Sequence, residues 1–277
     1  MLISVVSLVS TLLAALWCVC NGAFQGLGWL WMLPVGFVVV FLIQAVLIFL
    51  AVWILSKTID LNKPQEEDSK FFRWMLGVLI EAAHTILMMR VHTKGLEKTP
   101  KDGRFMLVCN HLNDFDPLVL LHAFRRSQLA FISKRENADR FIVGTLMHRI
   151  MCQPINREND REALQTILNC IRLLKEDKVS IGVFPEGYTS LDHKFHNFRP
   201  GVFKIAQKAK VPIVVCTVTN TFKVMGNLKK LKPTDIELHL LAVIPPEELE
   251  GVTAVDISNR IHAMMAEDLG SEYAQET

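Results

Sequence analysis

The sequence predicts an α/β fold, a mixed and largely parallel sheet covered by helices, with an N-terminal helical membrane anchor. Two observations predict it. Residues 1–56 contain no Asp, Glu, Lys, Arg or His, so all 30 Lys and Arg and all 28 Asp and Glu lie in the rest of the chain. From residue 100 onward, short apolar β-like runs alternate with helix-like segments, which is typical of a sheet covered on both faces.

The anchor is predicted from two apolar runs. Residues 2–20 form a run of 19 residues, and a helix of that length spans about 28 Å, close to the bilayer core. Residues 29–55 form the second run, with Trp31 and Trp53 placed where the two interfaces would lie. We expect residues 1–56 to be a membrane anchor of two helices. A monotopic hairpin in one leaflet and a hairpin buried in a soluble core remain alternatives.

Basic residues indicate the orientation of the anchor. Lys57, Lys63, Lys70 and Arg73 follow the second run, whereas the loop 21–28 contains neither Lys nor Arg. The positive-inside rule then places the chain from residue 57 onward on the cytoplasmic side of the cell membrane.

Residues 57–99 are expected to be a linker with an interfacial amphipathic helix at 71–91. A thin polar stripe on this apolar segment, at helical spacing, predicts a helix that lies at the interface or packs under the domain. The stripe consists of Arg73, Gly77, Glu81 and His84, and we expect His84 to face water.

The overall charge and the cysteines exclude other classes. A net charge of +2 excludes a strongly basic nucleic-acid-binding protein. The six cysteines form no CxxC pair and lie mostly in apolar runs, which suits a reducing compartment.

Residues 100–277 are expected to form the α/β domain. Strands are predicted at 104–110, 128–134, 152–156, 179–184, 211–220 and 235–244. Helices are predicted at 116–126, 141–151, 160–177, 201–210 and 255–269. Sites in such folds form where strands end and loops begin.

The first segment that could carry chemistry follows the strand 104–110. His111 lies at the strand end and Asp116 follows five residues later, so the carboxylate can orient the imidazole and leave its other nitrogen to act as a base. The spacing alone is also compatible with a polar loop in which Asp116 caps a helix.

Two more segments follow predicted strands. Glu186 lies beside Gly187, and a glycine lets the backbone approach a ligand closely. Arg157 lies after the short strand 152–156, and a guanidinium suits two-point binding of phosphate or carboxylate. Taken alone, each segment could be an ordinary loop with a solvated charge.

Taken together and in this order, the segments resemble the motifs of the lysophosphatidic acid acyltransferases (1-acylglycerol-3-phosphate acyltransferases), within the glycerolipid acyltransferases. The matching segments are Asn110-His111 through Asp116 (NHx4D), Ile155-Asn156-Arg157, Phe184-Pro185-Glu186-Gly187 (FPEG), Phe198-Arg199-Pro200-Gly201 and Val211-Pro212-Ile213 (VPI), with Lys134 after the second strand. One departure is that Tyr188-Thr189-Ser190 stands where the family usually has Thr-Arg-Ser.

The resemblance implies transfer of a fatty acyl chain from acyl-CoA or acyl-carrier protein to the free hydroxyl of 1-acylglycerol-3-phosphate. The product would be phosphatidic acid for phospholipid synthesis. The implied partners are the acyl donor, a membrane lipid acceptor and the bilayer, with no cofactor, metal or nucleic acid. His111 would be the general base and Asp116 would orient it. The groups that would bind the glycerol phosphate are Lys134, Arg157, Glu186, Gly187 and Arg199.

Several alternatives stay open at this stage. The acceptor could be glycerol-3-phosphate or another lysophospholipid, and the protein could bind lipid without catalysis. A metal-dependent hydrolase is disfavoured because Asp192, His193 and His196 lack HExxH spacing. No GxSxG elbow is present, and Cys109 is expected to be a buried strand residue rather than a nucleophile.

Overall fold

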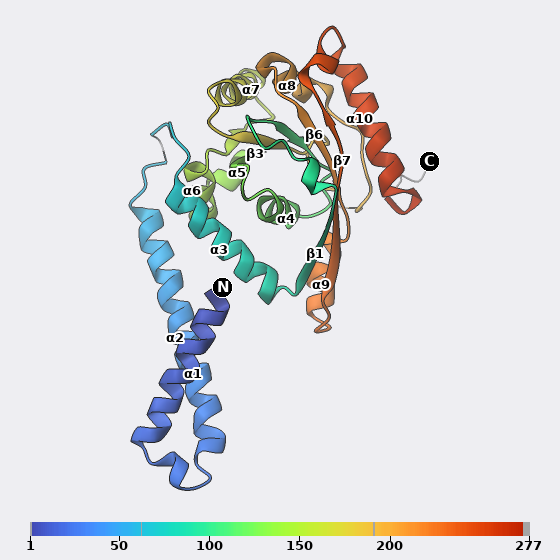
Figure 1. Cartoon of the computed structure of the whole chain (residues 1–277). Coiled ribbons are helices and arrows are strands. Elements are labelled where there is room, and N and C mark those ends of the chain that lie inside the picture. The colour runs from blue at the N-terminus through green and yellow to red at the C-terminus, as the bar shows by residue number, and fades with distance from the viewer. Residues whose placement is uncertain (1, 62, 191, 274–277) are drawn as a thin grey trace. The chain divides into compact units, whose positions relative to one another are not determined.

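The computed structural model describes residues 2–61, 63–190 and 192–273. Contacts divide the chain into two units, Met1–Lys63 and Pro64–Thr277, and Figure 1 shows the elements of both.

The first unit is a helical hairpin of α1 (Leu2–Cys20) and α2 (Trp29–Lys57), with a short 3-10 turn at Ala23–Gln25 between them. Gly36 lies where α1 packs against α2, and a Cβ there would stand 2.9 Å from the Trp17 ring. Gln44 donates a hydrogen bond to the hydroxyl of Ser10 across the pair, at 2.9 Å. Small and polar residues at a helix–helix contact are typical of packing in lipid.

Both helices of the hairpin are long and apolar enough to cross a bilayer, with mean hydropathies of 2.4 and 3.0. Most of their large apolar side chains are exposed within the unit. This supports membrane association and disfavours the alternative of a hairpin buried in a soluble core.

The described residues of the second unit form seven strands. They are β1 (Met89–Lys94), β2 (Met106–Val108), β3 (Leu129–Lys134), β4 (Gln153–Ile155), β5 (Ser180–Val183), β6 (Ile213–Val218) and β7 (Thr234–Ile244). The helices are α3 (Lys70–Ile86), α4 (Asp116–Ala123), α5 (Arg135–Ala138), α6 (Phe141–Arg149), α7 (Asp160–Lys175), α8 (Lys204–Ala209), α9 (Val224–Leu228) and α10 (Ala254–Leu269). Short 3-10 turns lie at Leu96–Lys98, Pro200–Phe203, Thr221–Lys223, Pro246–Leu249 and Ser271–Tyr273.

The strands form one sheet in the order β1-β7-β6-β2-β5-β3-β4. The pair β6–β7 is antiparallel, and every other neighbouring pair is parallel. The prediction of a mixed, largely parallel sheet covered by helices is therefore confirmed. The central strands β2, β5 and β6 are buried along their whole length, which is why they appear as continuous apolar runs in the sequence.

Helices cover both faces of the sheet. In Figure 1, α3 and α4 lie on one side, and α7, α8 and α10 lie on the other. The start of α7 is fixed by Asn159, whose side chain accepts hydrogen bonds from the backbone of Arg161 and Glu162 at 3.1 and 3.2 Å. Such a cap satisfies N–H groups that have no partner within the helix.

The helix predicted at 71–91 ends earlier than expected. α3 stops at Ile86, Met88 adopts a left-handed φ of 52°, and the chain reverses into β1, which pairs with β7. The segment predicted as linker therefore contributes an edge strand to the sheet. The apolar run through this turn continued the helical pattern, and the alternation of Met89 and Val91 with Arg90 was the signal for a strand.

α3 packs within the second unit, with Phe72, Ile80 and His84 buried. The expectation that His84 faces water was wrong. Arg73 also points inward, donating to the carbonyls of Leu129 and Ile150 at 2.8 and 3.2 Å. The predicted polar stripe is therefore partly an internal contact of the domain.

Candidate active site

The candidate site lies at one edge of the sheet, where parallel strands end. His111 follows β2, Glu186 follows β5, Lys134 ends β3 and Arg157 follows β4. Because β2, β5, β3 and β4 are parallel neighbours in that order, their carboxyl ends meet at this edge. Segments that are up to 75 residues apart in sequence, His111 and Glu186, are in hydrogen-bond contact there.

His111 and Asp116 form the pair that the sequence predicted. His111 Nδ1 lies 2.9 Å from Asp116 Oδ2, and the Asp116 side chain has no exposed surface whereas that of His111 is 14% exposed. A carboxylate in this position holds the proton on Nδ1 and leaves the Nε2 lone pair free to accept one.

Backbone and side-chain donors hold Asp116 as a carboxylate. Its Oδ2 accepts from the backbone N–H groups of Leu112 and Asn113 at 2.7 and 2.8 Å. Its Oδ1 accepts a short hydrogen bond from the Thr221 hydroxyl. Asp116 is also the first residue of α4, and a negative charge is favoured at a helix N-terminus. These interactions offset the cost of burying the charge.

Aromatic rings fix the plane of the imidazole. His111 stacks on Phe184 with ring centroids 4.1 Å apart and planes inclined by 17°. Phe184 in turn stacks on Phe131, at 5.4 Å and 6°. Gly182 lies beside Phe131 in the sheet, and a Cβ there would come within 2.5 Å of the Phe131 ring. The glycine therefore makes room for the ring that supports the stack.

Glu186 joins the loop after β5 to the loop after β2. Its two carboxyl oxygens accept from the backbone N–H groups of His111 and His196 at 2.8 and 3.0 Å, and the residue is 1% exposed. Burial raises the pKa of Glu186 to about 8, and the two backbone hydrogen bonds oppose the rise. These contacts make Glu186 a cross-link that positions His111, and its predicted role toward substrate stays a prediction.

Asn110 connects the end of β2 to β6, directly before His111 in the chain. Its side-chain amide donates to the Val218 carbonyl at 2.9 Å and accepts from the Val218 N–H at 2.8 Å. The neighbouring Cys109 is fully buried, and burial raises the pKa of its thiol well above the usual range. A buried, neutral thiol does not suit a nucleophile.

Two guanidinium groups lie beside the loop after β5. Gly187 has a left-handed φ of 83°, and a Cβ on it would stand 2.8 Å from Arg199 Nε. Desolvation and then the like charge of Arg199 lower the pKa of Arg157, so the two cations are close enough to repel each other. Within the described residues, neither forms an ion pair with a carboxylate. The pair suits binding of a dianion.

Lys134 is also at this edge, with its ammonium 3.0 Å from the Glu136 carboxylate. Glu136 in turn attracts Arg157. The structure therefore links Lys134, Glu136, Arg157, Arg199 and Gly187 as neighbours, and the contribution of each to substrate binding stays a prediction.

Three residues in contact with this machinery were missed by sequence reasoning. Thr189 places its hydroxyl 2.9 Å from His111 Nε2, Thr221 contacts Asp116, and Asn110 forms the connection to β6 described above. Thr189 and Thr221 lie in the loops that follow the buried strands β5 and β6. This position indicates the edge of the sheet where the site forms, but it does not specify the partner of either hydroxyl.

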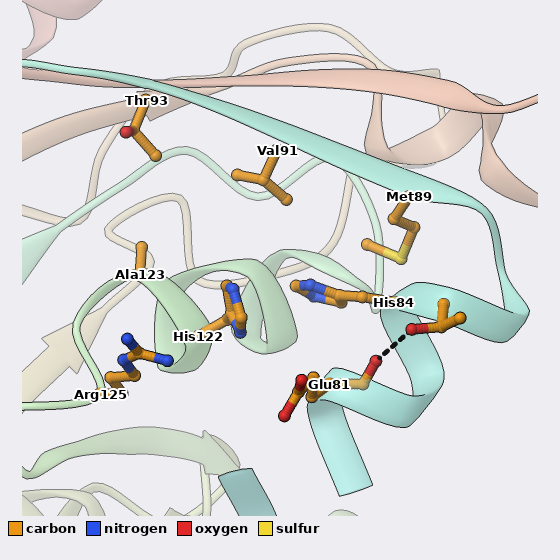
Figure 2. A pocket seen from close by; sticks show the side chains of 9 residues that line it. Glu81, His84, Met89, Val91, Thr93, His122, Ala123 and Arg125 are labelled. Atoms are coloured by element: carbon orange, nitrogen blue, oxygen red, sulfur yellow. Dashed lines mark hydrogen bonds between the residues drawn. The ribbon is translucent and has the colours of Figure 1, made fainter. Parts of the chain in front are cut away.

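A separate cavity of about 430 Å³ lies between α3, β1 and the end of α4 (Figure 2). It is lined by Glu81, His84, Thr85, Met89, Val91, Thr93, His122, Ala123 and Arg125. The rings of His84 and His122 are 4.6 Å apart, and burial followed by the charge of His122 lowers the pKa of His84 to about 4. None of the predicted site residues lines this cavity, so it is distinct from the histidine–aspartate pair.

Comparison with known proteins identifies the family of this site. Residues 90–219 match the family model described as Acyltransferase, and this range contains the His111–Asp116 pair, the loop after β5 and both guanidinium groups. This part of the chain is similar to the acyltransferases. The resemblance predicted from the ordered motifs is confirmed.

Curated relatives of this acyltransferase carry consistent names. A "Probable 1-acyl-sn-glycerol-3-phosphate acyltransferase" of Mycoplasma genitalium is 28% identical over 199 residues, covering 68% of this chain and 72% of the relative. A 1-acyl-sn-glycerol-3-phosphate acyltransferase of Chlamydomonas reinhardtii is 33% identical, covering 54% of this chain and 45% of the relative. A Bacillus subtilis protein of the same name is 31% identical, with 48% and 65% covered. The chain thus spans about half the length of several relatives that it matches.

A solved structure supports the fold. The 1-acyl-sn-glycerophosphate acyltransferase PlsC from Thermotoga maritima superimposes with a TM-score of 0.61 at 22% identity, covering 74% of this chain and 81% of that one. The likeness extends beyond the matched family range and confirms the α/β architecture.

Proposed function

We propose that this protein transfers a fatty acyl chain from an acyl thioester to the free hydroxyl of 1-acylglycerol-3-phosphate, forming phosphatidic acid for phospholipid synthesis. The observation that carries the proposal is the His111 Nδ1–Asp116 contact of 2.9 Å in a partly exposed site. The names of the curated relatives support the choice of reaction.

In this proposal, His111 Nε2 accepts the proton of the acceptor hydroxyl as its oxygen attacks the thioester carbon. Asp116 stabilises the imidazolium that forms. The C–S bond then breaks, and the thiolate of CoA or of the carrier protein takes the proton from His111. The new ester leaves as phosphatidic acid, and the histidine returns to its neutral form without any bound cofactor.

The charges beside the loop after β5 support a phosphorylated acceptor. Arg199 lies beside Gly187, and Arg157 is near enough to Arg199 for the two charges to interact. A lysophosphatidate phosphate carries between one and two negative charges near neutral pH. An uncharged glyceride would gain no charge-assisted hydrogen bond from either exposed guanidinium group.

We also propose that the catalytic domain faces the cytoplasm, where acyl thioesters are made. The second apolar helix ends at Lys57, and Lys63 and Lys70 follow it, which supports this side by the positive-inside rule. Protease added outside intact cells should therefore leave residues 100–277 uncut until the membrane is permeabilised. Rapid cleavage in intact cells would reverse the proposed orientation.

The catalytic proposal is tested with His111→Ala. Loss of the base should lower the rate of acyl transfer to lysophosphatidate about 10²–10⁴-fold, while thermal unfolding of the detergent-solubilised protein should change little. The matched control is His92→Ala, because His92 also pairs with an aspartate, Asp235, at 2.8 Å but on the exposed edge strand β1. Near-normal transfer by a folded His111→Ala protein would contradict the proposal.

The identity of the acceptor is tested with Arg157→Lys. This variant keeps the positive charge but loses the paired N–H donors with which a guanidinium group binds two phosphate oxygens. Because a hydrogen bond to a charged group contributes about 1.5–3 kcal/mol, the KM for lysophosphatidate should rise about tenfold to a hundredfold. The KM for the acyl donor and for an uncharged monoacylglycerol should change little.

The control for this substitution is Arg172→Lys, which alters an exposed guanidinium on α7 that pairs with Glu176. An equal rise in KM for lysophosphatidate and monoacylglycerol would show that Arg157 does not bind the phosphate. Assays with glycerol-3-phosphate and other lysophospholipids would then identify the acceptor.

A further inference from the structure

The Thr189 hydroxyl forms a hydrogen bond with Nε2 of His111, the nitrogen that would act as the base in the proposed reaction. Asp116 holds the proton on Nδ1, so Nε2 carries the lone pair, and the hydroxyl at 2.9 Å can only donate to it. The tautomer follows from this hydrogen-bond network. Thr189, His111 and Asp116 thus form a continuous chain of hydrogen bonds.

An imidazole Nε2 has one lone pair in the ring plane, so it accepts one good hydrogen bond at a time. The acceptor hydroxyl can reach the base only after Thr189 has left it. The same holds for water, which is an unwanted nucleophile toward an acyl thioester. An acceptor that is bound through its phosphate can displace the Thr189 hydroxyl, whereas a water molecule has no such additional contacts. The hydroxyl should therefore slow hydrolysis more than transfer to a bound acceptor.

The surrounding loop allows the Thr189 side chain to move while its backbone stays in place. The next residue, Ser190, donates its backbone N–H to the His111 carbonyl at 2.9 Å and its hydroxyl to Asp192 at 2.6 Å. On the other side, Gly187 donates its N–H to the Phe184 carbonyl at 3.0 Å. With the loop fixed at both ends, rotation about the Thr189 Cα–Cβ bond is enough to release Nε2.

We propose that Thr189 is a positioning residue that occupies His111 Nε2 until the acceptor hydroxyl displaces it, and so protects the bound acyl thioester from hydrolysis. The inference rests on the proposed function and extends it to selectivity between acceptor and water. In the reaction that Thr189 suppresses, water adds to the thioester carbon, the C–S bond breaks, and His111 passes the proton of water to the thiolate. The products are a free fatty acid and a free thiol.

The competing role for the same contact is that of a nucleophile, because a hydroxyl on a histidine–aspartate pair is also the arrangement of a covalent acyl-transfer triad. Thr189 Oγ1 would then form an acyl ester that the acceptor or water cleaves. The two roles predict opposite results when the hydroxyl is removed. If Thr189 only blocks the base, removal of its hydroxyl increases hydrolysis. If Thr189 is the nucleophile, removal of its hydroxyl abolishes both transfer and hydrolysis.

The test compares wild type with Thr189→Val, which keeps the side-chain shape without the hydroxyl, and with Thr189→Ser, which keeps the hydroxyl. Full-length protein in detergent is given acyl-CoA, and thiol release without acceptor is measured beside transfer to lysophosphatidate. Thr189→Val should raise the ratio of hydrolysis to transfer about threefold to tenfold, the factor expected for one lost hydrogen bond. Thr189→Ser should restore the wild-type ratio.

Two control variants separate this effect from a general disturbance. Thr99→Val removes a hydroxyl that bonds the Leu96 carbonyl at 2.7 Å outside the site, and it should leave the ratio unchanged. The double variant His111→Ala with Thr189→Val should lose the added hydrolysis, because that hydrolysis requires the base. Thr189→Ala provides the same comparison with a smaller side chain if the valine variant unfolds.

An unchanged ratio in folded Thr189→Val, or a loss of both activities with an acyl group found on Thr189 of the wild type by mass spectrometry, would overturn the proposal. Failure of the proposed function has a different result. If the proposed function is wrong, the wild type transfers no acyl chain to lysophosphatidate. A rise in hydrolysis by Thr189→Val would in that case still support the protective role of Thr189. If the wild type does not transfer and the variant does not hydrolyse, both proposals are wrong.

Discussion

Asp116 is a carboxylate whose side chain has no exposed surface, and four hydrogen bonds converge on it. An uncompensated charge there would cost several kcal/mol, so the loop after β2, the start of α4 and the turn after β6 are held in one arrangement around it. The position and tautomer of His111 follow from that arrangement. The active-site geometry therefore depends on the satisfaction of one buried negative charge.

Two further contacts connect this charge to the sheet. Asn110 continues the hydrogen bonding between β2 and β6 where the regular strands have ended, and Glu186 attaches the loop after β5 to the His111 backbone. The stacked rings of Phe184 and Phe131 then extend the support toward β3. His111 is thus held by residues in or next to four neighbouring strands, and the exposed Arg199 lies beside Gly187.

Much of this could be predicted from the sequence. The alternation of apolar runs and helical segments predicted the layered fold. His111 and Glu186 were each predicted to follow a strand, in the region where such folds form their sites. Thr221 could not be placed on Asp116, because the contact joins residues 105 positions apart and no local pattern records it. β1 was missed because the apolar run before it continued the helical period across the turn at Met88. The contact between Thr189 and His111 depends on side-chain direction, which spacing does not specify.

We infer that Asp116 makes His111 a base by holding its proton on Nδ1, and the variant Asp116→Asn examines this role. An asparagine keeps the size of the side chain, but its neutral amide can neither stabilise the imidazolium nor fix the tautomer. Steady-state kinetics with acyl-CoA and lysophosphatidate should show kcat lowered about 10²–10⁴-fold, with the KM for lysophosphatidate nearly unchanged. A folded Asp116→Asn protein that keeps its kcat within a fewfold of wild type would contradict the account.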